Sequence, residues 1–126
     1  MLTVNLDQRP QGVEKLNPFT AYPIAIEVQL DCKLYKLLAD LSPHTPWGDR
    51  RMAANIIGSM RNPESLPGLL AALATDNFWM VRCAIIQALE MIGDPRAIPA
   101  LQEAAISDSF QVVRSYAAKA VDRLSQ

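Results

Sequence analysis

The sequence has few of the residues that metal sites and phosphate-binding loops require. Among its 126 residues there are 5 glycines, 2 cysteines and one histidine. Five scattered glycines make no glycine-rich loop. His44 has no second histidine or cysteine near it, and Cys32 and Cys83 lack the paired spacing of a zinc site. No Ser-His-Asp order or paired carboxylates suggest catalysis. We therefore expect no catalytic residue, no metal and no cofactor.

An excess of one charge and a long apolar run are also absent. The chain has 12 basic and 13 acidic residues, for a net charge of −1. Binding to nucleic acid needs a clear positive excess that neutralises phosphates, so we expect no nucleic-acid partner. No apolar run approaches the roughly 20 residues that span a bilayer, and the N-terminus lacks the apolar core of a signal peptide. We expect a cytoplasmic protein without membrane insertion, whose cysteines stay reduced.

What the sequence does have is an internal repeat of 32 residues. Hydrophobic residues make up 50% of the chain, and an offset of 32 aligns Trp47 with Trp79 and Arg50 with Arg82 and Arg114. Eight of the 32 positions in 47–78 are identical in 79–110, and no gap is needed. A period of this length indicates a repeat array in which each unit buries its apolar face against its neighbours.

Each repeat is predicted to hold two helices. In the first helix, apolar residues recur at i, i+3, i+4 and i+7, as from Ile85 to Ile92, which is the spacing of one buried helical stripe. Asn62 or Asp94, each followed by proline, is a typical N-cap for the second helix. A further proline four residues later should leave the start of that helix irregular.

The capping prediction extends to the ends of the repeats. Asp76-Asn77 and Asp108-Ser109 are expected to cap the first helix of the following repeat, and Thr45-Pro46 the helix that begins near Trp47. The predicted organisation is a tail over 1–20 and a repeat domain over 21–126, made of a half unit over 24–41, full units over 47–78 and 79–110, and a half unit over 111–126.

The run from Val81 to Leu101 carries a resemblance to a known family. Its Val81-Arg82, Ala88-Leu89 and Gly93-Asp94-Pro95-Arg96 segments resemble the short HEAT repeats of the phycobilisome-lyase-like kind. The resemblance covers about 24–126 and implies an all-α fold, a right-handed α-α superhelix. Members of that family include accessory subunits of bilin lyases, phycobilisome-degradation factors and adaptors, so the fold does not fix a function.

The repeated arginines Arg50, Arg82 and Arg114 have two interpretations. In the structural one, each binds a carbonyl of the neighbouring repeat or an aspartate such as Asp108, and Asp94 is a further structural residue of the repeat. In the other, the arginines form a basic stripe for an acidic partner. Charge reversal at Arg82 separates the two, because it unfolds the protein in the first case and only weakens binding in the second.

Other residues are candidates for partner binding or thiol chemistry. Trp47 and Trp79 share a column with the polar Gln111, which predicts a partly exposed indole of the kind that anchors interfaces. Polar groups expected on the rim of the second helices are Glu64, Arg96, Lys36 and Glu103. Cys32 and Cys83 fall in polar columns, which predicts accessible thiols, although cysteine is also a common apolar filler.

These observations favour a non-catalytic protein–protein interaction module, an adaptor that is a monomer or weak homodimer. By resemblance, its partner is a phycobiliprotein or an assembly factor of a photosynthetic antenna. The alternative is an accessory subunit of a bilin lyase or a chaperone that handles a tetrapyrrole. Visible absorbance on the purified protein would separate these hypotheses.

Overall fold

Helices in two layers make up the part of the chain that the structure describes. The structure is a computed structural model that describes residues 32–126. The predicted tail over 1–20 and residues 24–31 of the half unit over 24–41 lie outside the described residues. A first described helix covers residues 32–39, and residues 36–126 belong to one compact unit. The described residues contain helices and turns and no strand.

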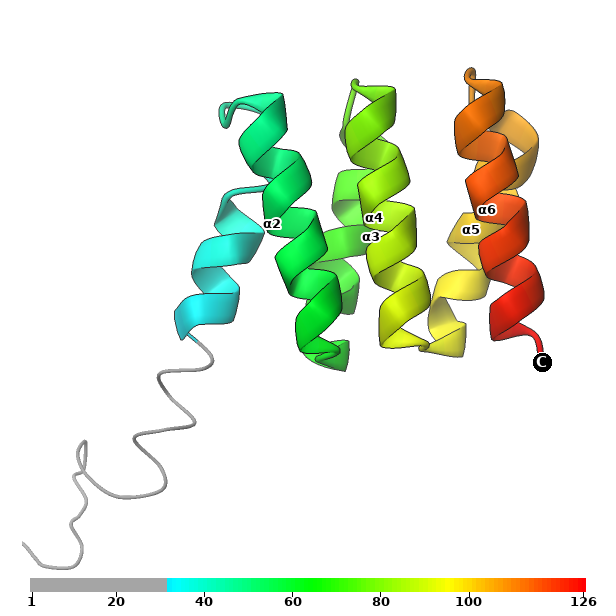
Figure 1. The fold of residues 1–126 in the computed structure, drawn as a ribbon, viewed down its shortest axis with the longest axis horizontal. Coiled ribbons are helices and arrows are strands. Elements are labelled where there is room, and N and C mark those ends of the chain that lie inside the picture. Colours follow the sequence, from blue (N-terminus) through cyan, green and yellow to red (C-terminus); the bar gives the residue numbers. More distant parts are fainter. Residues whose placement is uncertain (1–31) are drawn as a thin grey trace, which may run out of the picture. The chain divides into compact units, whose positions relative to one another are not determined.

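The first layer consists of three long helices that lie side by side. They are α2 (Trp47–Met60), α4 (Trp79–Ile92) and α6 (Gln111–Leu124), and they run in the same direction (Figure 1). Each begins 32 residues after the one before it, at Trp47, Trp79 and Gln111. The predicted all-α solenoid with a period of 32 is therefore confirmed.

The second layer lies behind the first and contains shorter helices (Figure 1). Each repeat contributes a 3-10 turn and an α-helix: η2 (Pro63–Ser65) with α3 (Leu66–Thr75), and η3 (Pro95–Ala97) with α5 (Ile98–Ser107). Pro67 and Pro99 stand in the first turn of α3 and α5, where a missing N–H is tolerated. The predicted irregularity is thus a 3-10 turn that precedes each α-helix.

Side chains of aspartate and asparagine start the second layer as the sequence predicts. The Asn62 side chain accepts a hydrogen bond from the backbone N–H of Glu64, and Asp94 accepts one from that of Arg96. Each bond satisfies an N–H that the helix start would otherwise leave without a partner.

The core lies between the two layers. Its most buried members come from the apolar stripes of both helices of each repeat, among them Ile57, Leu69, Ile85, Leu89 and Leu101. Full burial of a leucine or isoleucine contributes about 1.5–3 kcal/mol, so these stripes stabilise the packing of the two layers. None of the described helices has the length and apolar character needed to cross a membrane.

The predicted caps of α4 and α6 are wrong. The N-caps of α4 and α6 are Phe78 and Phe110, neither of which makes a side-chain cap hydrogen bond. The Oδ1 atoms of Asp76 and Asp108 instead accept the N–H groups of these phenylalanines, at 2.9 and 3.0 Å. The aspartates close a turn before the helix because arginines hold their carboxylates there. For α2 the predicted pair Thr45-Pro46 does contain the N-cap, which is Pro46, but no side chain makes a cap hydrogen bond there.

Candidate functional site

An arginine and an aspartate of the next loop form a repeated unit, which we call a clasp. In the first clasp, Nε and Nη2 of Arg50 on α2 donate to Oδ2 and Oδ1 of Asp76 at 2.8 and 3.2 Å. Nη1 of the same arginine donates to the carbonyl oxygen of Thr45 at 2.5 Å. Such a forked, charge-assisted arrangement fixes both the position and the orientation of the carboxylate.

The second clasp has the same geometry one repeat later. Nε and Nη2 of Arg82 donate to Oδ2 and Oδ1 of Asp108 at 2.7 and 2.9 Å, and Nη1 donates to the carbonyl oxygen of Asp76 at 3.0 Å. Only 11% of the Arg82 side chain and 9% of the Asp108 side chain are exposed. The structural interpretation of the arginines named a carbonyl or an aspartate as the partner, and Arg82 binds both.

The clasp sets the charge state of Asp108. Desolvation by burial would raise the pKa of this carboxyl. The hydrogen bonds from Arg82 and from the N–H of Phe110, together with the positive charges of Arg82 and Arg114, outweigh that effect. The pKa of Asp108 therefore lies below its ordinary value, and the carboxylate stays charged at neutral pH.

Arg114 on α6 repeats only part of the clasp. Its Nη1 donates to the carbonyl oxygen of Asp108 at 2.6 Å, as Arg82 does to Asp76. No carboxylate of the described residues lies within hydrogen-bond distance of its Nε and Nη2 atoms. The third arginine is thus oriented like the other two, but its forked edge is not engaged by the described chain.

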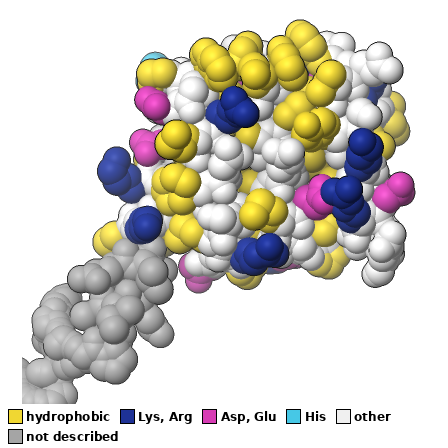
Figure 2. Space-filling model, viewed as in Figure 1, with side chains coloured by type: hydrophobic (Ala, Val, Ile, Leu, Met, Phe, Trp, Pro, Cys, Tyr) yellow, Lys and Arg dark blue, Asp and Glu magenta, His cyan; other side chains and the backbone are white. Residues whose placement is uncertain are grey.

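Four aromatic side chains form a row across the N-terminal ends of the three long helices. We call this row, made of Trp47, Phe78, Trp79 and Phe110, the aromatic edge. The ring centroids are 4.7 Å apart between Trp47 and Phe78, 6.4 Å between Phe78 and Trp79, and 5.9 Å between Trp79 and Phe110. Figure 2 shows hydrophobic side chains gathered along this side of the molecule.

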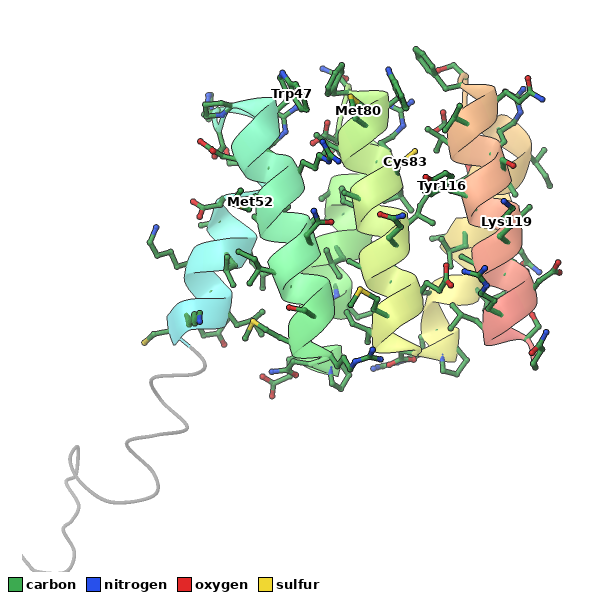
Figure 3. The ribbon with its side chains drawn as sticks, viewed as in Figure 1. Trp47, Met52, Met80, Cys83, Tyr116 and Lys119 are labelled. Atoms are coloured by element: carbon green, nitrogen blue, oxygen red, sulfur yellow. The ribbon has the colours of Figure 1, made fainter. Side chains whose placement is uncertain are left out.

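The two ends of the aromatic edge are open to solvent. Trp47 is 44% exposed and Phe110 is 46% exposed, whereas Phe78 and Trp79 are half-buried between them. Trp47 projects from the start of α2 toward α4 (Figure 3). The sequence pattern selected the two tryptophans and not Phe78 or Phe110. The signal that could have found Phe110 is its neighbour Gln111. This glutamine stands in the column of Trp47 and Trp79, so no third tryptophan follows Phe110 to cover its ring.

The charged candidates do not converge on one site. Nζ of Lys36 lies 3.9 Å from Oδ2 of Asp40, and Arg96 forms an exposed ion pair of 2.7 Å with Asp94. Hydrogen bonds from the Arg96 side chain and backbone N–H lower the pKa of Asp94 below its ordinary value. Glu64 is exposed in η2.

Glu103 belongs to a separate hollow. It lies on α5 beside a cavity of about 290 Å³ lined mostly by small and apolar side chains of α3 and α5, including Leu73, Ala100 and Ala104. The residues of the polar rim predicted from sequence therefore lie on separate elements: the helix over 32–39, η2, η3 and α5.

The predicted accessibility of Cys83 is wrong. Cys32 is exposed, but Cys83 is buried, because it lies on the side of α4 that faces α6 (Figure 3). Burial, with a smaller contribution from the Asp108 charge, raises the pKa of the Cys83 thiol and outweighs the opposing effect of Arg82. A buried, protonated thiol is a poor nucleophile, so Cys83 has the properties of an apolar filler.

A groove that the sequence did not predict runs along the outer surface of the first layer. It has a volume of about 600 Å³ and is lined by Asn55, Gln87, Glu90, Met91, Tyr116, Lys119 and Arg123. Arg123 of α6 forms an ion pair with Glu90 of α4 across it. Among residues 32–126, no group of three or more histidines, cysteines or acidic residues is placed to hold a metal ion.

Comparison with known proteins gives two findings. The family described as HEAT repeats matches residues 34–122 of this chain. A protein of Mastigocladus laminosus named bilin biosynthesis protein PecE is 43% identical over 67 residues, which are 50% of this chain and 25% of that protein. The chain therefore matches about a quarter of the length of this relative.

Proposed function

Because the chain belongs to the HEAT-repeat family, we propose that it is a non-catalytic interaction module that docks a partner protein on its aromatic edge. The observation that carries this proposal is the row of four aromatic rings with solvent-exposed ends at Trp47 and Phe110. Tryptophan and other aromatic residues dominate the energetics of interfaces because they bury a large area with few rotatable bonds.

The scaffold below the aromatic edge supports this role. Phe78 and Phe110 are held at the helix starts by hydrogen bonds to Asp76 and Asp108, which the clasp arginines hold in turn. A surface whose backbone is already fixed loses little conformational entropy when a partner binds. The edge thus combines apolar area with rigidity.

The class of partner is proposed from the relative. Its name places it in bilin biosynthesis, and the matched 67 residues amount to half of this chain. We therefore propose a phycobiliprotein, or a factor that assembles one, as the partner. The alternative that the same relative favours is an accessory role in a bilin lyase, with the bilin itself in contact with this chain.

The test measures binding of purified phycobiliprotein subunits, with and without their bilin, to the full chain by calorimetry. Trp47→Ala and Phe110→Ala should each weaken binding about tenfold or more. Met52→Ala is the matched control, because Met52 is 62% exposed on α2 but lies outside the aromatic edge. Equal loss in all three variants would show nonspecific apolar adhesion and contradict the proposal.

A second titration uses the free bilin. A saturable change in its visible absorbance on addition of the chain would favour the lyase-accessory alternative. Failure of both the subunits and the bilin to bind would remove the proposed class of partner.

A further inference from the structure

The two complete clasps bind the same short segment. Asp76-Asn77-Phe78 is held by Arg50, and Asp108-Ser109-Phe110 by Arg82, so each clasp holds an Asp-x-Phe segment. In both, the aspartate binds the forked edge of the arginine and also accepts the phenylalanine N–H. In two places, therefore, an arginine of this chain binds the same three-residue pattern, Asp-x-Phe, in the same way.

The aromatic ring of the segment is bound as well. The Phe78 ring packs on Trp47 and the Phe110 ring on Trp79, with centroids 4.7 and 5.9 Å apart. Cζ of Arg82 lies 5.9 Å from the centroid of the Phe110 ring, within the range of a cation–π contact. The arginine thus contacts both the charge and the ring of the segment.

Arg114 has the same orientation and an unengaged forked edge. Its Nη1 is fixed by the carbonyl oxygen of Asp108 at 2.6 Å, the contact that positions the other two arginines. The carboxylate of Asp108 is already held by Arg82 and by the N–H of Phe110. Among the described residues, the Nε and Nη2 donors of Arg114 have no carboxylate to bind.

We propose that Arg114, at the start of α6, docks the aspartate of an Asp-x-Phe segment that belongs to a different polypeptide. The carboxylate binds Nε and Nη2 of Arg114, and the ring of the segment stacks on the guanidinium. Gln111 stands where the other repeats have tryptophan, so the ring contributes less here than in the two clasps. The aspartate carries the specificity.

A second copy of this chain is a poor occupant. The sequence contains an aspartate followed two residues later by phenylalanine only at Asp76 and Asp108. Both aspartates are held in clasps of their own chain. A copy could supply one only by opening its own clasp, which disfavours a second copy as the occupant.

The site is independent of the proposed function. Arg114 is not part of the aromatic edge, and the edge can bind its partner without an Asp-x-Phe segment. Loss of binding in Trp47→Ala with binding intact in Arg114→Gln, or the reverse, separates the two proposals.

The test uses a labelled ten-residue peptide with the sequence of residues 104–113, which carries Asp108 and Phe110, and measures its fluorescence anisotropy with the full chain. We expect saturable binding that falls about tenfold or more for an Asp108→Asn peptide, because hydrogen bonds to a charged group are lost. A Phe110→Ala peptide should bind a few-fold more weakly.

The protein variants locate the site. Arg114→Gln should weaken the peptide about tenfold or more, whereas Arg123→Gln, which changes another arginine of α6, should not. A peptide that instead displaced the chain's own loop from Arg82 would bind Arg114→Gln and the unaltered protein equally.

Three results overturn the proposal: no saturable binding, equal binding of the Asp and Asn peptides, or equal binding by Arg114→Gln. If Arg114→Gln does not fold, as judged by circular dichroism, Arg114→Lys, which keeps the charge but lacks the forked edge, takes its place in the same comparison.

Discussion

The junction between α2 and α4 is packed more closely than the junction between α4 and α6, although equivalent helices of the 32-residue repeat meet at both. At the first, a Cβ atom added to Gly58 would lie 2.8 Å from the Cα atom of Ala88, so the two backbones are in direct contact. At the same register of α4 stands Glu90, which reaches across to Arg123 of α6. The first junction is closed by backbone contact at Gly58, whereas the groove of about 600 Å³ is lined mostly by side chains of α4 and α6.

The clasp is the part of the repeat that both junctions share. Each junction has a complete clasp near the N-terminal ends of its helices, with Arg50 and Asp76 at the first and Arg82 and Asp108 at the second. The difference arises nearer the C-terminal ends of the helices, where the same repeat position is Gly58 on α2 and Glu90 on α4. The clasp therefore sets the register of the repeats, and the residue at positions 58 and 90 sets how closely their helices approach.

The largest effect on stability is expected when Gly58 of α2 is replaced by glutamate, the residue at the equivalent position of α4. Gly58→Glu should lower the free energy of unfolding by about 3 kcal/mol, because any side chain there meets the α4 backbone and forces the helices apart. Urea denaturation measures the change. Gly48→Glu is the matched control, since a Cβ at Gly48 has no atom within 4 Å. Equal stability of both variants would contradict the proposed role of Gly58.

The next effect concerns the clasp that both junctions share. Arg82→Gln should lower the free energy of unfolding by about 2 kcal/mol, because it leaves the nearly buried carboxylate of Asp108 without its charged donors. Arg96→Gln, which changes an exposed paired arginine, should have little effect. If Arg82→Glu folds normally and loses only partner binding, the basic-stripe interpretation of the arginines holds instead.

The lowered pKa of Asp108 predicts that the stability of the protein depends on pH. Its pKa is lowered in the folded state, so the folded protein favours the charged form more than the unfolded chain does. This contribution is complete above the unfolded pKa of about 4 and disappears as the pH falls through the lower folded value. Asp108→Asn should therefore be less stable than the unaltered protein at pH 7, and the difference should shrink in acid. Denaturation curves from pH 7 to 2.5 test this, and a constant difference would contradict it.

A smaller effect is expected from the ion pair at the second junction. Glu90→Ala should change the free energy of unfolding by no more than about 1 kcal/mol, because the Arg123 side chain of this pair is largely exposed. A double-mutant cycle with Arg123→Ala measures the coupling. A coupling well above 1 kcal/mol would mean that the pair holds α6 in place, and not only that it borders the groove.

The smallest effect is expected at the end of α2. Arg61 adopts a left-handed conformation with φ of 53°, where Gly93 stands in the next repeat with φ of 76°. Arg61→Gly relieves this strain but removes the 2.8 Å hydrogen bond from Nη1 to the carbonyl oxygen of Met91. Since each term is about 1 kcal/mol, the net change should be within about 0.5 kcal/mol. Thermal unfolding measures it, and a loss above 1 kcal/mol would give the bond to α4 the larger role.

Sequence reasoning predicted the features that repeat and missed those that do not. The start of each long helix followed from the 32-residue offset, and the turns at Asn62 and Asp94 followed from capping rules. The close contact at Gly58 was not predictable from the pattern, because the glycine is set by what lies opposite it on α4.

The candidate site shows the same division. Trp47 was selected correctly as a candidate for exposure, since its column ends in Gln111. Cys83 was misjudged because its column contains Arg51 and Ser115, which are exposed on α2 and α6. Position in a column does not distinguish a helix with neighbours on both sides, such as α4, from one with fewer.

The buried thiol of Cys83 is a probe of local opening between α4 and α6. Its sulfur lies on the α6 side of α4, and a thiol reagent can reach it only when the two helices separate (Figure 3). The rate at which a reagent modifies Cys83 in the native protein therefore reports how often the junction between α4 and α6 opens. Hydrogen exchange gives the same information for backbone amides. Cys32, exposed in the same chain, reacts without delay and supplies the reference rate.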